Sequence, residues 1–200
     1  MAAAAIGLLS ACSGEDSTPN IIQGEDSGFR GALLTREIEL PDATLTDVDG
    51  EAFDLRRETA DFVTLLYVGY TNCPDLCPTH MAEIAAALKE LPEEERSGLK
   101  VLFVTSDPER DTPEVLREWL ANFDPSFIGL TGTADELAAL QRDLGMNVAT
   151  QEHTEHGYEV NHASYVLAFP RHDRTAKLAY PSGMTREDYR EDLLTLLGVE

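Results

Sequence analysis

Two of the three cysteines in the sequence, Cys73 and Cys77, have three residues between them and follow closely after an apolar run at residues 62–69. If a helix begins within this motif, the two sulfurs lie about one turn apart and face the same way. A thiolate at a helix N-terminus is stabilised by the helix dipole and by free backbone N–H groups, which lower its pKa. The pair can therefore exchange electrons, bind a soft metal ion, or do both.

His162 is the third residue that could join this chemistry, because it stands immediately before another apolar run at residues 163–169. Ligand-binding groups in α/β sheets collect at strand ends. Two thiolates and one imidazole suit Cu(I) and adapt to Cu(II). Zinc fits less well, because a structural zinc site normally has four protein ligands. The residues alone leave open the alternative that His162 is an ordinary surface or core histidine.

The elements that must position these residues alternate along the chain. A β-hairpin is predicted at residues 38–55, and strands and helices then follow in turn; the strands are expected at residues 63–69, 99–105 and 127–130, and the helices at 79–91, 112–122 and 133–144. A second hairpin at residues 163–180 and a helix at 185–197 close the chain. This order predicts an α/β protein with a mixed central sheet flanked by helices and an N-terminal β-hairpin. A cysteine pair at the first long strand-to-helix junction makes the arrangement thioredoxin-like.

The N-terminal residues 1–12 resemble a lipoprotein-type signal segment. Residues 2–11 are small and apolar, and Leu9-Ser10-Ala11-Cys12 resembles a bacterial lipobox, which implies that Cys12 is lipidated. The run is too short to span a bilayer, and no basic residue precedes it, so we expect a truncated signal. The alternative is a frayed apolar terminus with an incidental cysteine.

The segment that follows Cys12 is polar. Residues 13–36 predict a flexible tether, and residues 37–200 form the predicted globular domain. We therefore expect a lipid-anchored protein on the extracytoplasmic face of the cell membrane. In such an oxidising compartment, the remaining pair Cys73 and Cys77 forms a disulfide or binds a metal.

The overall charge excludes one class of partner. The chain carries 37 acidic and 15 basic residues, a formal net charge of −22. Nucleic-acid binding needs clustered Lys and Arg, so we expect no nucleic-acid partner. Such acidity would suit cations or a basic partner surface, although a solvated surface that keeps the protein soluble is the favoured interpretation.

Taken together, several motifs resemble those of the Sco/SenC family over residues 38–197. They are Cys73-Pro74-Asp75-Leu76-Cys77-Pro78, the segment 107–113, His162 with Ser164 and Tyr165, and the segment 183–189. The resemblance implies a thioredoxin-like fold and one copper ion, Cu(I) or Cu(II), bound by Cys73, Cys77 and His162. It further implies a metallochaperone that delivers copper to the binuclear copper site of cytochrome c oxidase. The partners would be the copper-bearing subunit of that oxidase and a copper donor.

Two enzymatic alternatives stay open beside the chaperone. A thiol-disulfide reductase would use Cys73 and Cys77 as its redox-active pair, and it would not need His162. A thiol peroxidase of the same fold is the third possibility, although the close CxxxC pair disfavours it.

Other residues near these motifs receive ordinary structural interpretations. Asn161 stands where the family commonly has Asp, so it can orient the imidazole but cannot add charge. Asp107 and Asp111 are expected to brace a turn or cap a helix rather than act as catalytic carboxylates. The remaining residues are expected in exposed loops, on a helix or in the core; they are His153, His156, His80, Met81, Met146 and Met184.

Overall fold

The computed structural model describes residues 21–22, 27–154 and 157–199. Cys12, the predicted signal segment and His156 lie outside the described residues. The helices are α1 (Leu55–Glu58), α2 (Leu76–Glu90), α3 (Glu93–Arg96), α4 (Pro113–Ala121), α5 (Ala134–Asp143) and α6 (Arg186–Leu197). The strands are β1 (Ile21–Ile22), β2 (Ala32–Glu39), β3 (Thr44–Asp47), β4 (Ala52–Asp54), β5 (Val63–Gly69), β6 (Leu99–Thr105), β7 (Ile128–Thr131), β8 (Thr150–Thr154), β9 (Gly157–Asn161), β10 (Val166–Phe169) and β11 (Thr175–Tyr180).

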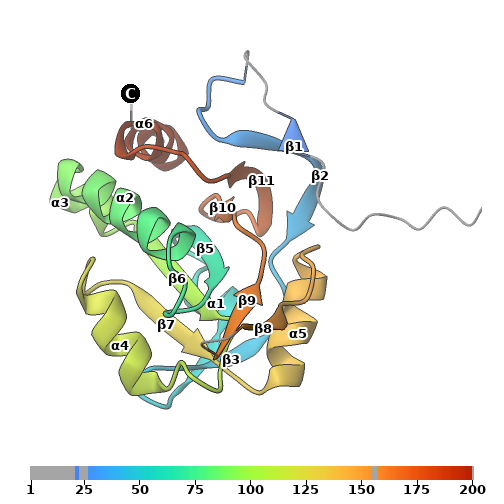
Figure 1. Cartoon of the computed structure of the whole chain (residues 1–200). Helices are drawn as coiled ribbons and strands as arrows, with labels where there is room; N and C mark the ends of the chain where they lie inside the picture. Colours follow the sequence, from blue (N-terminus) through green and yellow to red (C-terminus); the bar gives the residue numbers. More distant parts are fainter. Residues whose placement is uncertain (1–20, 23–26, 155–156, 200) are drawn as a thin grey trace, which may run out of the picture.

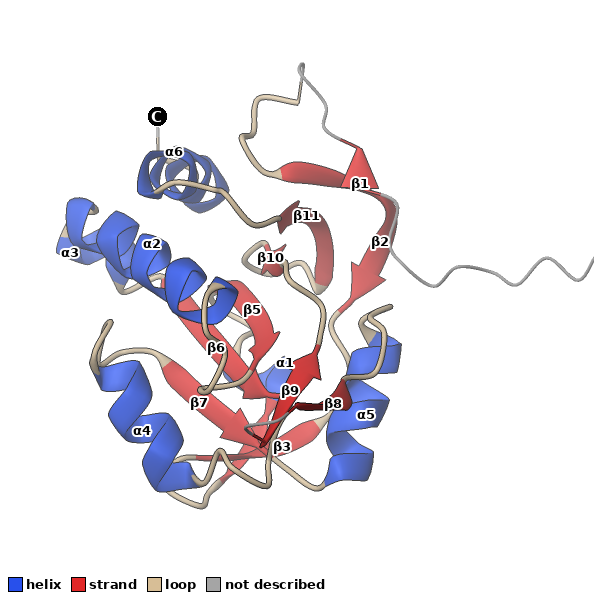
Figure 2. Ribbon diagram, in the orientation of Figure 1, coloured by secondary structure: helices blue, strands red, loops and turns tan. Residues whose placement is uncertain are grey.

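Nine of these strands form one mixed sheet in the order β1-β2-β11-β10-β5-β6-β7-β3-β4. Strands β5, β6 and β7 run parallel, and the remaining neighbours pair antiparallel. One sheet face packs against α2, α4 and α6, and the other against α1 and α5 (Figures 1 and 2). The predicted mixed sheet flanked by helices is confirmed, and β3 and β4 form the predicted N-terminal hairpin.

The centre of the sheet is held by β5 and β6. All seven residues of β5 are buried, and they pair in continuous register with β6 from Val63–Leu99 to Gly69–Thr105. A strand that is buried on both faces reads as a near-continuous apolar run, which is why the sequence identified both strands. Because the two strands are parallel, their carboxyl ends meet at one edge of the sheet. The loops that follow Gly69 and Thr105 therefore begin side by side.

The opposite direction of β10 brings a third segment to that edge. Strand β10 pairs antiparallel with β5, with Leu167 opposite Leu66 and Phe169 opposite Thr64. The amino end of β10 thus lies at the carboxyl end of β5. His162 lies four positions before β10 and is therefore placed beside the CxxxC loop.

Three differences from the sequence prediction concern α2, β2 and the segment before His162. Helix α2 begins at Leu76 rather than at residue 79, because Pro78 lies in the first turn, where its missing N–H would have no helical partner. Residues 32–36, expected within the tether, form the first part of β2, which pairs with β11. The buried Asp192 carboxylate fixes this segment by accepting the N–H groups of Arg30 and Gly31 at 2.7 and 2.8 Å.

The third difference is a separate two-stranded sheet, β8–β9, where an irregular loop was expected. Its residues are mostly polar and exposed, so no apolar alternation marks them in the sequence. The strand β9 ends at Asn161, directly before His162. This hairpin therefore delivers the histidine to the edge of the main sheet.

The central sheet yields a stability prediction. Leu66 is fully buried between β6 and β10, so Leu66→Ala leaves a cavity and should lower the free energy of unfolding by about 2–5 kcal/mol. Val115 on α4 is 38% exposed, and Val115→Ala should cost about 0.5 kcal/mol or less. Urea unfolding of both variants measures the difference. Equal losses would show that β5 is not the centre of the core.

Candidate metal centre

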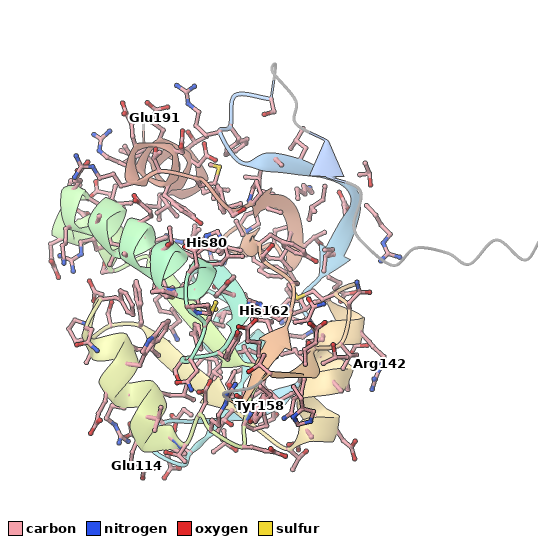
Figure 3. The ribbon with its side chains drawn as sticks, viewed as in Figure 1. His80, Glu114, Arg142, Tyr158, His162 and Glu191 are labelled. Atoms are coloured by element: carbon pink, nitrogen blue, oxygen red, sulfur yellow. The ribbon has the colours of Figure 1, made fainter. Side chains whose placement is uncertain are left out.

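Three side chains from separate parts of the chain converge at the carboxyl end of β5. The sulfurs of Cys73 and Cys77 and a ring nitrogen of His162 all lie within 4.8 Å of one another. Cys77 Sγ lies 3.6 Å from His162 Nε2, although the residues are 85 positions apart. Figure 3 shows His162 below the end of α2, at the junction between the main sheet and the β9 hairpin. The sequence-predicted set is therefore assembled in the fold.

The Cys73 sulfur occupies the place of a helix cap. The N-cap residue of α2, Asp75, makes no side-chain capping hydrogen bond. Instead, the backbone N–H of Cys77 in the first turn donates to Cys73 Sγ at 3.5 Å. The first N–H groups of a helix lack helical partners and favour a negative charge. The helix start thus supplies a direct reason for Cys73 to be a thiolate.

The two thiols have opposite acidities. A hydrogen bond from the Cys77 thiol is the main cause that lowers the pKa of Cys73 to about 3, and backbone N–H groups add to it. Burial raises the pKa of Cys77, which has no exposed surface, and the hydrogen bond to Cys73 raises it further. The expected low pKa at the helix start therefore holds for Cys73 and fails for Cys77, because desolvation of a buried thiolate outweighs the helix dipole.

Tyr67 is a residue of the site that the sequence prediction missed. Its hydroxyl contacts Cys77 Sγ at 3.5 Å from within the buried strand β5. A tyrosine in a buried, mostly aliphatic strand needs a partner for its hydroxyl, and this was the available signal. The hydroxyl can donate to the Cys77 sulfur when that sulfur is deprotonated.

The imidazole of His162 is oriented by its own backbone and by aromatic rings. Its Nδ1 lies 2.7 Å from the carbonyl oxygen of Ala163, and only a protonated Nδ1 can donate there. That tautomer leaves the Nε2 lone pair free beside the sulfurs. The rings of Tyr67 and Tyr70 meet the imidazole edge-on, at 6.0 and 5.4 Å between centroids. The ring is thus held with its coordinating nitrogen toward the two cysteines.

The acidic segment after β6 supports the CxxxC loop. Buried Asp111 accepts hydrogen bonds from the Thr71 backbone N–H at 3.1 Å, the Thr71 hydroxyl at 2.6 Å and the Thr105 hydroxyl at 2.7 Å. Asp107 pairs with Arg110, and Thr112 caps α4. The bracing and capping roles predicted for this segment are confirmed. Asp111 goes further, because it ties the loop after β6 to the loop that carries Cys73.

His80 and the methionines have structural positions. His80 is buried on α2, where its ring nitrogens lie 3.1 Å from the Tyr189 hydroxyl and 3.3 Å from the Ser164 carbonyl oxygen. Met81 and Met146 are buried in the core, and Met184 packs against it. His153 lies in β8 rather than in a loop, exposed and facing the Tyr158 ring.

The donor atoms decide what the site can hold. Two sulfurs and one imidazole nitrogen form a soft, three-donor set, which suits copper better than calcium or magnesium. Within the described part of the chain, this is the one cluster of at least three potential ligands close enough to share a metal ion.

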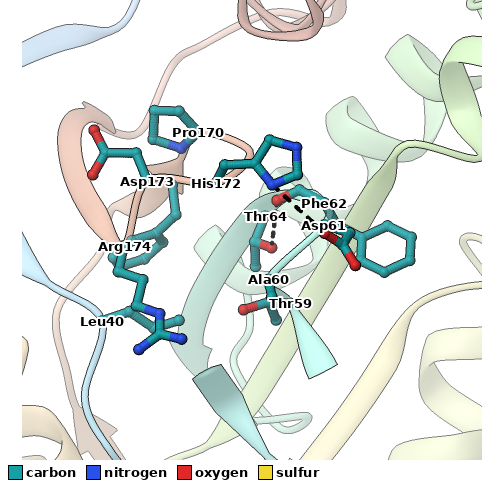
Figure 4. A pocket seen from close by; sticks show the side chains of 11 residues that line it. Leu40, Thr59, Ala60, Asp61, Phe62, Thr64, Pro170, His172, Asp173 and Arg174 are labelled. Carbon is teal, nitrogen blue, oxygen red and sulfur yellow. Dashed lines mark hydrogen bonds and ion pairs between the residues drawn. The ribbon is translucent and has the colours of Figure 1, made fainter. Parts of the chain in front are cut away.

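The pocket in Figure 4 lies at the opposite end of β5. It has a volume of about 230 Å³ and is lined by residues that include Phe62, Thr64 and Pro170. Its exposed contact between His172 Nδ1 and Asp61 Oδ1, at 3.5 Å, contains no sulfur donor. We therefore place the chemistry of the molecule at the cysteine edge and not in this pocket.

A match to a family model identifies the family of the chain. The family model of SCO1/SenC matches residues 36–198. The chain belongs to the SCO1/SenC family. This SCO1/SenC protein is 36% identical over 131 residues to a relative from Stutzerimonas stutzeri, and the match covers 66% of this chain and 64% of the relative. It is 33% identical over 123 residues to mitochondrial SCO2 of Saccharomyces cerevisiae, which covers 60% of this chain and 40% of the yeast protein. The matched region is thus less than two thirds of the length of either relative.

Solved structures share the fold. Bradyrhizobium japonicum ScoI, solved with copper bound, superposes with a TM-score of 0.71 at 29% identity, covering 80% of this chain and 99% of that one. Apo Sco1 of Thermus thermophilus gives a TM-score of 0.72 at 28% identity, covering 88% and 100%. The predicted thioredoxin-like Sco fold is confirmed.

The acidity of Cys73 can be measured directly. In the reduced, metal-free protein, Cys73 should stay a thiolate through the mildly acidic range, because the pKa of about 3 must be approached before it protonates. Alkylation by iodoacetamide should therefore remain fast as the pH falls below neutral, and Cys77→Ala should slow it by removing the main hydrogen-bond donor. Cys73→Ser is the control, since Cys77 is buried. An alkylation rate that falls as the pH drops through about 8.5 would contradict the geometry.

Proposed function

We propose that this SCO1/SenC protein is a copper metallochaperone that binds one copper ion through Cys73, Cys77 and His162. The observation that carries the proposal is the convergence of these three donor atoms within 4.8 Å. Two relatives in the structural comparison, Bradyrhizobium japonicum ScoI and yeast Sco1, were solved with copper bound, which supports the same cargo here. Soft thiolates favour Cu(I), and the imidazole extends the set to Cu(II).

The acidities of the donors fit metal capture at neutral pH. Cys73 is already ionised, so it gives the ion an initial negative ligand. Cys77 has a raised pKa and must release its proton when metal binds. The Tyr67 hydroxyl, at 3.5 Å, supplies a hydrogen bond to the sulfur that loses the proton. The residues present therefore fit copper and keep Cys77 protonated until the metal arrives.

The exposure of the ligands favours transfer by ligand exchange. Cys73 and His162 are partly exposed, whereas Cys77 is fully buried. A soft ligand of an acceptor can reach the ion from the Cys73 and His162 side and replace these donors in turn. Oxidation of Cys73 and Cys77 to a disulfide by an external two-electron oxidant would remove two of the three ligands and release the metal. Both cysteines are free thiols in the structure, and the disulfide stays a prediction.

For the acceptor, we propose the copper-bearing subunit of cytochrome c oxidase, at its binuclear copper site, with a separate copper donor upstream. The proposal follows from membership of the SCO1/SenC family. Lipidation at Cys12 would hold the domain on the extracytoplasmic face of the cell membrane, where this acceptor site is assembled. A lipoprotein of the same family from Bacillus anthracis shares the fold at 23% identity with a TM-score of 0.64. Among the described residues, none of the helices has the length and apolar character needed to cross a bilayer.

Anaerobic copper titration tests the binding proposal. The reduced protein should take up one copper ion and, as Cu(II), show thiolate-to-copper charge-transfer absorption. Cys73→Ser should weaken and shift that absorption, because one of its two thiolates is lost. His162→Ala should shift it and weaken binding by at least the roughly 10- to 100-fold that the loss of an outer-shell partner costs. His153→Ala is the matched control, because His153 is exposed on β8 and outside the ligand set. Unchanged stoichiometry and spectrum in Cys73→Ser and His162→Ala would refute the site.

A specific observation favours a second candidate, a thiol-disulfide reductase of the oxidase cysteines. Cys73 is partly exposed with a lowered pKa, and Cys77 lies beside it as a resolving thiol. An exchange reaction needs no imidazole, so His162→Ala should then retain full reductase turnover. If His162→Ala keeps full reductase turnover and the unaltered protein has negligible copper affinity, the reductase is the function and the chaperone proposal fails.

A further inference from the structure

The hairpin that carries His162 is not stable by its own hydrogen bonds. Strands β8 and β9 pair only with each other and form no bridge to the nine-stranded sheet. A two-stranded hairpin is marginally stable in water unless other elements pack against it. Only one residue of β9, Val160, is buried in the core. His162 follows Val160 by two positions, so its place depends on the contacts that the hairpin makes with the rest of the domain.

The closest of these contacts involve Arg110 and Tyr158. The guanidinium carbon of Arg110 lies 3.7 Å from the centre of the Tyr158 ring, a stacked cation–π contact. Arg110 Nη1 also donates to the Tyr158 carbonyl oxygen at 3.0 Å, so one side chain holds both the ring and the backbone of β9. The Tyr158 hydroxyl in turn donates to Asp107 Oδ1 at 2.9 Å.

Asp107 anchors this group to the main sheet. Its carboxylate is buried, pairs with Arg110 and accepts the Tyr158 hydroxyl, directly after strand β6. The Arg110 guanidinium carbon also lies 5.8 Å from the centre of the Tyr70 ring, which meets the His162 imidazole edge-on at 5.4 Å between centroids. Asp107, Arg110 and Tyr158 thus link the loop after β6 to the β8–β9 hairpin and to the Tyr70 ring beside His162.

We propose that Arg110 and Tyr158 are positioning residues for metal binding: they clamp the β8–β9 hairpin to Asp107 and thereby set the place of His162 against the two cysteines. This role rests on the proposed copper function, since it concerns the third ligand of that site. Neither residue contacts the metal-binding atoms in the described structure. The clamp acts through the backbone of β9 and through the Tyr70 ring.

Arg110→Lys is the informative variant. Lysine keeps the positive charge beside buried Asp107, so we expect the fold to be retained, but it lacks the planar face and the second N–H direction of Arg. Copper(II) affinity should fall about 10-fold or more, and the nitrogen coupling of the His162 ligand in electron paramagnetic resonance should weaken. In the metal-free variant, amide hydrogen exchange in β8 and β9 should accelerate. Arg117→Lys, at an exposed arginine that pairs with Asp49 and contacts neither Asp107 nor Tyr158 by any hydrogen bond or ion pair found among the described residues, should change none of these.

Two substitutions of Tyr158 separate a positioning role from a general effect on stability. Tyr158→Leu removes the ring face and should reproduce the loss of affinity and of nitrogen coupling, whereas Tyr158→Phe keeps the stacking and should restore most of both. This pair decides the question if Arg110→Lys does not fold. If Arg110→Lys or Tyr158→Leu folds and keeps the copper affinity and spectrum of the unaltered protein, the positioning role is wrong and the copper function stands. An unaltered protein that binds no copper overturns the proposed function, and the clamp role with it.

Discussion

The parallel pairing of β5 with β6 is the constraint on which the rest of the structure depends. Because both strands are buried and aligned over seven residue pairs, the loops that follow them must start at the same edge. The antiparallel strand β10 then places its amino end at that edge, and with it His162. The three candidate ligands meet because of strand direction, and no local motif could bring residues 85 positions apart together.

At that edge, the start of α2 is capped by a candidate metal ligand. The start of α2 lacks a side-chain cap from Asp75 and uses the sulfur of Cys73 instead. The hydrogen bond from the Cys77 thiol is the main cause that lowers the pKa of Cys73, and the backbone N–H at the helix start adds to it, while burial raises the pKa of Cys77. This asymmetry favours both proposed activities, because an exposed thiolate starts metal capture as well as disulfide exchange. The imidazole of His162, fixed through Ala163, is the feature that makes metal binding the better explanation.

Much of this arrangement could be predicted from the sequence, for identifiable reasons. The central strands are continuous apolar runs, Thr112 and Pro113 mark the start of α4, and the CxxxC motif is recognisable wherever it occurs. The hairpin β8–β9 could not be predicted, because its residues are exposed and contacts such as that of Arg110 with Tyr158 leave no periodic pattern in the sequence. The same holds for β2 from Ala32 onward, since its anchor, Asp192, lies at the far end of the chain.

The coordination of copper by this site is most directly tested by X-ray absorption spectroscopy of the copper-loaded, reduced protein at the copper edge. The geometry predicts that the nearest shell contains two sulfur donors, from Cys73 and Cys77, and one imidazole nitrogen, from His162. A shell with only oxygen and nitrogen donors, or one in which the imidazole signal persists in His162→Ala, would contradict the proposed centre.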